Sequence, residues 1–132
     1  MASARVPLVD YLRLEPEPHL VAHECRHCGA RFFDRRNACA RCGRSDFAPA
    51  GVDGAGELQA FSIVHRAAPG IPVPFVSAIV NTDDGTWVRS NLVNCDPTPE
   101  AVTLGMRVRL TTYPVGTDDD GTEAVAFGYE PT

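Results

Sequence analysis

The chain has 132 residues and a mass of 14.2 kDa, which is the length of one domain or of two very small ones. Hydrophobic residues make up 44% of it and charged residues 22%, a composition that excludes a disordered chain and a fibrous repeat. The 11 glycines and 11 prolines favour many short elements joined by turns over a few long helices. The net charge of -5 argues against tight general binding to nucleic acid, because such binding depends on basic residues that neutralise phosphates.

Residues 1–21 are expected to form an N-terminal arm. Val6, Leu8, Val9, Leu12 and Leu14 give one apolar side to a short helical piece, which the prolines that follow would end. An arm of this size cannot fold alone, so it either packs on the rest of the chain or docks onto a partner. The sequence contains no apolar run of about 18 residues and no basic N-terminal region followed by an apolar core, and we therefore expect a cytoplasmic protein without a membrane span.

Four of the five cysteines form two C-x-x-C pairs within residues 22–50. Cys25 and Cys28 make the first pair, and Cys39 and Cys42 make the second. This spacing predicts a zinc site, since each pair presents two thiolates from one tight turn and two turns complete a tetrahedron. All four ligands come from the protein, so the zinc is expected to be structural. Iron is the alternative metal, because four cysteines also hold rubredoxin-type iron.

The third stretch, residues 51–132, contains five runs rich in β-branched or aromatic residues and bounded by turn signals. The runs are Leu58–His65, Pro74–Asn81, Thr86–Val93, Met106–Tyr113 and Glu123–Tyr129. Thr98, Pro99 and Glu100 form a helix-start signal between the third and fourth runs. Three strands, a short helix and two more strands is the order of an OB-fold barrel. A five-stranded open sheet and an SH3-like barrel are the alternatives.

Six of the twelve basic residues, all of them arginine, fall between positions 26 and 44. They could be solvated charge that balances the thiolates, or they could form a surface for a phosphate group or an acidic partner. Arg35 and Arg36 are the candidate contacts on this segment, and Arg66, next to His65 at the end of a predicted strand, is a third.

The order of motifs resembles a known family. The two cysteine pairs are followed by Gly56-Glu57-Leu58, then by Phe61 to His65, Pro74-Phe75-Val76, Asp84-Gly85, Asn91-Leu92 and Gly105 to Val108. This order is similar to that of the acyl-CoA-associated OB-fold proteins that carry an N-terminal rubredoxin-like zinc ribbon, a family long classed as a domain of unknown function. The resemblance implies a mainly β chain with three parts: the helical arm, the zinc ribbon at 22–50 and a five-stranded OB-fold at 51–132.

The resemblance also implies a function. Family members accompany thiolase-like enzymes, including sterol-carrier-type aldolases, and the partner carries the catalytic residues. The chain is therefore expected to be a non-catalytic accessory subunit of a hetero-oligomer that acts on acyl-CoA thioesters, in bacterial steroid or fatty-acid side-chain degradation.

Two other hypotheses remain open. One is a single-stranded nucleic-acid binder that stacks bases on Trp87, Phe61, Phe75 or Tyr113. The other is a thioester hydrolase that uses Cys95 or His65.

Overall fold

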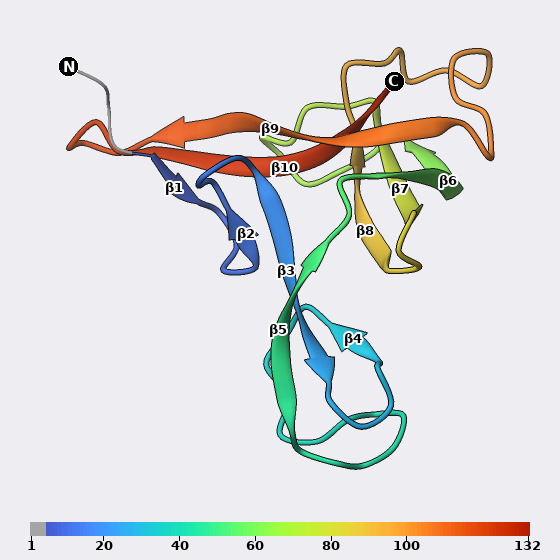
Figure 1. The fold of residues 1–132 in the computed structure, drawn as a ribbon. Coiled ribbons are helices and arrows are strands. Elements are labelled where there is room, and N and C mark those ends of the chain that lie inside the picture. The colour runs from blue at the N-terminus through green and yellow to red at the C-terminus, as the bar shows by residue number, and fades with distance from the viewer. Residues whose placement is uncertain (1–4) are drawn as a thin grey trace.

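The structure, a computed structural model, describes residues 5–132, and its regular elements within that range are all β-strands (Figure 1). In chain order the ten strands are β1 (Arg5–Pro7), β2 (Leu12–Arg13), β3 (His19–Cys25), β4 (Arg31–Phe32), β5 (Phe47–Val52), β6 (Ala55–Val64), β7 (Phe75–Thr82), β8 (Trp87–Leu92), β9 (Arg107–Thr117) and β10 (Glu123–Pro131). None of the residues in this range forms a helix long and apolar enough to cross a membrane.

The last five strands form a closed barrel. β6 pairs with β7, β7 with β8, β8 with β10 and β10 with β9, and β9 returns to pair with β6. All these pairs are antiparallel except the short parallel contact between β8 and β10. This order is that of an OB-fold, and closure rules out the open sheet. The prediction of a mainly β chain with a five-stranded barrel is confirmed, and each strand lies within a few residues of its expected run.

Alternating side chains fill the barrel. Along β7 every second residue is buried, and Val76 and Val80 at these positions are 1% and 0% exposed. Leu58, Val88 and Val108 meet them from the neighbouring strands. This period-2 pattern is the signal that made the strands recognisable in the sequence.

The zinc-ribbon segment projects from the barrel as a twisted hairpin (Figure 1). β3 and β5 are its antiparallel stem, paired from Leu20 with Val52 at the barrel to Cys25 with Phe47 at the far end. β2 and β4 extend this small sheet on the other edge of β3. Leu20 and Val52 belong to the same buried cluster as the barrel residues, so the base of the stem shares the barrel's core.

The predicted helical arm is wrong. Residues 5–7 form β1, which pairs in parallel with Glu123–Val125 of β10, and the Leu8 N–H donates to the Val125 carbonyl at 2.7 Å. Leu12, in β2, is fully buried. The backbone groups on the free edge of β10 explain the outcome. Pairing with this edge gives the arm interstrand hydrogen bonds, and its β-branched residues and proline favour a strand over a helix. The arm therefore packs on its own chain, and only residues 1–4 of it lie outside the described residues.

The helix expected after Asp96 is reduced to one hydrogen-bonded turn. The Thr98 carbonyl accepts from the N–H groups of Ala101 and Val102, each at 3.2 Å, and the Thr98 hydroxyl also accepts from Ala101. The capping signal was thus interpreted correctly, but the helix was not. Gly105, with φ of +84°, turns the chain into β9 too soon for a second turn.

We predict that Leu12→Ala lowers the free energy of unfolding by about 2–5 kcal/mol, because it leaves a cavity in the shared core. Urea denaturation followed by tryptophan fluorescence would measure the change. Leu8→Ala is the matched control, since Leu8 is 58% exposed and its loss should cost about 0.5 kcal/mol or less. Equal effects of the two substitutions would contradict the packing of the arm described above.

Candidate functional site

The two C-x-x-C pairs sit on matching turns at the far end of the ribbon. In the first turn the Gly29 N–H donates to the Cys25 carbonyl at 2.9 Å, and in the second the Gly43 N–H donates to the Cys39 carbonyl at 2.8 Å. Both glycines have φ near +80°, a conformation that other residues adopt only with strain. The turns direct backbone N–H groups towards the sulfur atoms, as in the bond from the Arg41 N–H to the Cys39 sulfur at 3.4 Å.

The structure brings the four predicted cysteines together. Their sulfur atoms all lie within 4.8 Å of one another, and the Cys25–Cys42 and Cys28–Cys39 sulfur pairs are 3.6 Å apart. Four sulfurs placed about 2.3 Å from a tetrahedral zinc would be about 3.8 Å apart, so this group fits the metal. The separation is too long for disulfides, whose S–S bond is about 2.05 Å.

Local hydrogen bonds prepare the thiols for a cation. The backbone N–H groups of Cys28 and His27 lower the pKa of the Cys25 thiol. Burial opposes ionisation of Cys39, but the N–H groups of Cys42 and Arg41 outweigh it and the pKa of the Cys39 thiol falls. The Cys42 sulfur accepts a hydrogen bond from the Arg44 N–H, which lowers the pKa of its thiol, but burial and the neighbouring sulfurs raise this pKa by more. A zinc held by these four thiolates has no position open for substrate.

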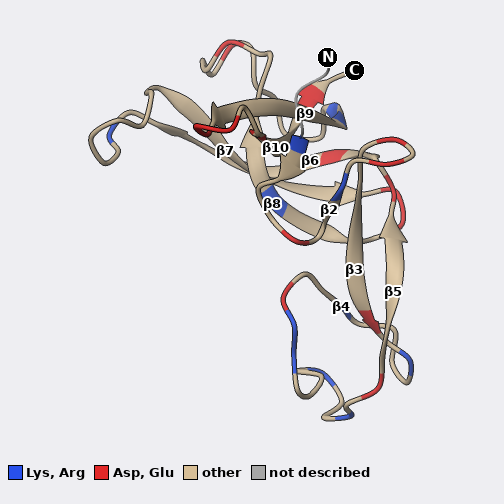
Figure 2. Cartoon of the chain, turned by 90° about the vertical axis from the view of Figure 1, so that its left-hand side faces the viewer, with Lys and Arg blue, Asp and Glu red and all other residues tan. Residues whose placement is uncertain are grey.

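The arginines of the ribbon surround this end of the hairpin (Figure 2). Arg36 pairs with Asp34 at 3.3 Å and lies 4.3 Å from the centre of the Phe32 ring, whereas Arg35 forms no ion pair within residues 5–132. Arg66 is exposed in the loop between β6 and β7, on the barrel rather than on the ribbon. The structure thus places Arg35 and Arg36 together and Arg66 on another part of the molecule.

Arg31 connects the ribbon to the barrel. Its guanidinium donates to Glu24 at 3.1 Å within the ribbon, and to Asp84 and the Thr86 hydroxyl, both at 3.0 Å, in the turn between β7 and β8. Asp84 also accepts from the Asp53 N–H at 2.8 Å, in the joint between stem and barrel. Nothing in the sequence alone pointed to this contact, because it joins residues more than fifty positions apart.

Asp84 is held in its ionised form. Burial opposes ionisation, but hydrogen bonds from the Thr82 hydroxyl, the Asp53 N–H and Thr86 keep the pKa of the Asp84 carboxyl well below its usual range. A carboxylate with a lowered pKa stabilises the fold above its unfolded pKa of about 3.9, and this contribution is lost as the pH falls below that value.

The candidate catalytic residues do not form a site. The Cys95 sulfur lies 3.7 Å from the Ala101 carbonyl, and burial and then the charge of Asp96 raise the pKa of its thiol, which disfavours the nucleophilic thiolate. His65 is exposed at the end of β6. Of the four aromatic residues considered for base stacking, Trp87 is exposed, while Phe61, Phe75 and Tyr113 are partly buried.

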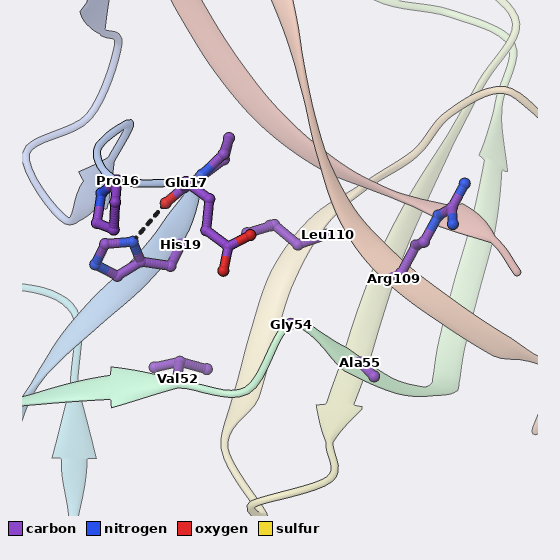
Figure 3. Close-up of a pocket in the computed structure, with 9 residues that line it drawn as sticks. Pro16, Glu17, His19, Val52, Gly54, Ala55, Arg109 and Leu110 are labelled. Carbon is purple, nitrogen blue, oxygen red and sulfur yellow. Dashed lines mark hydrogen bonds between the residues drawn. The ribbon is translucent and has the colours of Figure 1, made fainter.

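A pocket of about 550 Å³ lies where the arm, the stem and the barrel meet (Figure 3). Glu17 and His19 line one side, Val52 and Gly54 the floor, and Arg109 of β9 the other side. The His19 Nδ1 lies 2.8 Å from the Glu17 carbonyl, and since a carbonyl only accepts, Nδ1 carries the proton. Sequence reasoning missed this pocket because three distant segments build it.

Two family models match the chain. One, described as "ChsH2, rubredoxin-like zinc ribbon domain", matches residues 14–48, and the other, "ChsH2, C-terminal OB-fold domain", matches residues 51–112. The chain is 30% identical over 115 residues to a "DUF35 domain-containing scaffold protein" of Methanocaldococcus jannaschii, a match that covers 84% of this chain and 79% of the relative. The chain belongs to the DUF35 family.

Further relatives agree with this assignment. A DUF35 scaffold protein of Methanothermobacter thermautotrophicus is 27% identical over 117 residues and 86% of each chain. A "probable enoyl-CoA hydratase alpha subunit" of Thermomonospora curvata is 28% identical over 92 residues, which are 69% of this chain and 28% of that protein. The solved structure "Ltp2-ChsH2(DUF35) aldolase" shares the fold, with a TM-score of 0.66 and 24% identity over 86% of this chain and 84% of that one. The DUF35 chain thus carries a structural zinc in its rubredoxin-like ribbon.

We predict that the DUF35 chain binds about one zinc ion and that Cys39→Ser removes it. Metal analysis of the purified protein by mass spectrometry would give the stoichiometry. Because the stem base packs in the barrel core, loss of zinc should disorder the ribbon end and leave the barrel folded. Cys95→Ser is the control and should retain the metal; a zinc-free chain with an ordered ribbon would contradict the assignment.

We further predict that Asp84→Asn lowers the free energy of unfolding at pH 7 by about 1–3 kcal/mol, because it breaks hydrogen bonds to a charged group. The difference between wild type and variant should shrink as the pH falls below about 4, since the unfolded wild-type chain then binds a proton at Asp84 that the folded chain, with its lowered pKa, does not bind. Urea titrations at several pH values would measure both. Asp119→Asn, in the exposed turn before β10, should change little at any pH.

Proposed function

We propose that this chain is a non-catalytic accessory subunit of a thiolase-like enzyme, a thiolase or a sterol-carrier-type aldolase, that acts on acyl-CoA thioesters. The observation that carries the proposal is its similarity, over most of its length, to proteins named as DUF35 scaffold proteins. The name of the solved relative joins Ltp2 to ChsH2(DUF35) in an aldolase, and a third relative is named as a hydratase subunit for an enoyl-CoA. Bacterial steroid or fatty-acid side-chain breakdown in the cytoplasm is the proposed setting.

The chemistry of the chain is consistent with a non-catalytic accessory role. The zinc group uses four protein thiols and leaves no ligand position for a substrate. The Cys95 thiol has a raised pKa, and His65 lies in solvent at a strand end. A rigid barrel with a projecting ribbon offers two surfaces to a partner, which is what a scaffold requires.

The arginine side chains are the proposed contacts for the phosphates of coenzyme A. Arg35 is the strongest candidate, because its guanidinium is exposed and forms no ion pair within the described residues. Arg36 shares its charge with Asp34 and stacks on Phe32, and Arg66 would have to act from the barrel loop. Guanidinium groups suit phosphate because they donate two hydrogen bonds in one plane.

We predict that the chain forms a stable complex with a thiolase-like protein of its host. Co-expression followed by size-exclusion chromatography with light scattering would show a particle heavier than either protein alone. Thioester turnover should require the partner's residues, so Cys95→Ala in this chain should leave the activity of the complex unchanged. Elution of the two proteins as separate species would overturn the proposal.

The phosphate contact is tested on the intact complex. Arg35→Ala should weaken coenzyme A binding about tenfold, as loss of one charge-assisted hydrogen bond predicts. If Arg35 binds the 3′-phosphate, the substitution should weaken the binding of dephospho-coenzyme A, which lacks that group, by a smaller factor. Calorimetry would measure both affinities. Arg13→Ala, in β2, is the control substitution. Equal affinity of wild type and Arg35→Ala for coenzyme A would remove the arginine from the site.

A further inference from the structure

The first part of β8 has a neighbouring strand on one side only. Its six residues pair with β7, but its strand pairing with β10 is confined to Leu92 opposite Tyr129, with the Val93 N–H donating to the Tyr129 carbonyl at 2.8 Å. The one further hydrogen bond to β10 recorded for the described residues of β8 comes from a side chain, the Ser90 hydroxyl, which donates to the Phe127 carbonyl at 3.4 Å. Further along β10, Glu123–Val125 pair with β1 instead. The arm has taken the place on β10 that β8 would need to close the barrel along its whole length. The edge of β8 from Trp87 to Ser90 is therefore left without a strand among the described residues.

The backbone groups on this edge can be assigned from the turn that precedes it. The Thr82 N–H donates to the Thr86 carbonyl at 2.9 Å, which makes these two residues a hydrogen-bonded pair at the start of the ladder. Pairs alternate along antiparallel strands, so Val88 and Ser90 direct their backbone groups towards β7, and Trp87 and Arg89 direct theirs away from it. These groups of Trp87 and Arg89 take no part in the other backbone hydrogen bonds of residues 5–132.

The side chains on this edge are accessible. Trp87 is 61% exposed, an unusual state for the one tryptophan of the chain, and Arg89 is exposed as well. Figure 2 shows β8 with the ribbon projecting below it. An exposed edge of this kind is a template on which another extended chain can pair.

A pocket lies at each end of the edge. Near Trp87 a pocket of about 410 Å³ is bounded by the first zinc turn and by the β7–β8 turn, with Arg31 and Arg41 in its lining. Near Arg89 and Asn91 a pocket of about 210 Å³ is lined by apolar and aromatic side chains, among them Leu8 and Phe127. In recognition by strand addition, main-chain hydrogen bonds give affinity and such pockets receive alternate side chains.

The charges favour an acidic occupant. The charge of Arg31 is matched by Glu24 and Asp84. Arg41 and Arg89, one at each pocket, form no ion pair within the described residues. A segment with carboxylates near its two ends and an apolar residue for the smaller pocket would be complementary to this edge.

We propose that the β8 edge from Trp87 to Ser90 binds an extended, acidic segment of the partner subunit as an added β-strand. This proposal rests on the proposed function, because it assigns the surface through which the accessory subunit holds its thiolase-like partner. The ribbon and the arm flank the edge, so both would also contact the added segment.

Residue-resolved hydrogen exchange of the free chain and of the complex tests the proposal. The amides of Trp87 and Arg89 should exchange at least about tenfold more slowly in the complex, because they gain partners there. Those of Val88 and Ser90 are internal controls, since their bonds to β7 exist in both states. A complex in which Trp87 and Arg89 exchange as fast as in the free chain would overturn the edge proposal and leave the accessory role standing. Absence of a complex would instead overturn the proposed function and the edge proposal with it.

Substitutions separate charge from folding. Arg89→Glu should weaken association about tenfold or more, whereas Arg89→Lys should retain most of it and Arg13→Glu, in β2, should change little. Trp87→Ala is the second variant, and it should weaken association through lost contact area. Unfolding midpoints of each variant would verify that the barrel is intact. Unchanged association of folded Arg89→Glu and Trp87→Ala would contradict the proposal, as would protection of the same amides by a single-stranded oligonucleotide at physiological salt.

Discussion

The arrangement of this molecule depends on the carboxylate of Asp84. It lies in the turn between β7 and β8 and accepts hydrogen bonds from the ribbon through Arg31, from the joint through the Asp53 N–H, and from its own turn through Thr82 and Thr86. A partly buried charge is stable only when its hydrogen bonds are made, and these donors come from three separate segments. The orientation of the ribbon on the barrel is therefore tied to one ionised group, while the shared core below it holds the stem base in place.

The short N-terminal arm determines which edges of the barrel sheet are paired. Its first strand, β1, pairs with β10 and satisfies backbone groups that would otherwise be exposed at a sheet edge, and its second, β2, pairs with β3 and places Leu12 in the common core. The pairing of β1 keeps β10 from covering the start of β8. One edge of the barrel is closed and another is left open, and the open one carries the exposed tryptophan. The arm thus links the stability of the fold to the surface that we propose for the partner.

The zinc centre and the β8 edge have different roles: the zinc centre stabilises the ribbon, and the β8 edge is the surface that we propose for the partner. A zinc on the four cysteines would order the far end of the ribbon, about 25 residues that contain few buried apolar side chains, while Arg31, Asp84 and the stem base set the position of the ribbon on the barrel. The edge then lies between a basic ribbon and an apolar pocket, in a protein whose net charge is negative. Selectivity for one partner can follow from this local charge even though the whole chain would repel most acidic surfaces.

The sequence by itself determined the grouping of the four cysteines, the five barrel strands and their order. These features are local or periodic: C-x-x-C turns place two sulfurs without help from distant residues, and alternating apolar side chains mark Phe75–Thr82 as clearly in the sequence as in the fold. It also gave the capping role of Thr98, although it overstated the helix that follows. The sequence indicated the family through the order of these motifs.

Only the tertiary structure decided what the arm does, how the ribbon is fixed and which edge stays open. The apolar residues of the arm suit a helix in isolation, but Val6 lies in a strand because β10 offers an edge to pair with, and Leu12 lies in another because β3 does. Arg31 and Asp84 are ordinary charged residues in the sequence, and their contact exists because folding brings together positions more than fifty residues apart. Trp87 could be a core residue or a surface one on pattern alone. It alternates with the buried Val88 and so lies on the outer face of β8. Whether the backbone edge beside it is paired depends on where β1, β8 and β10 separate, which only the tertiary structure shows.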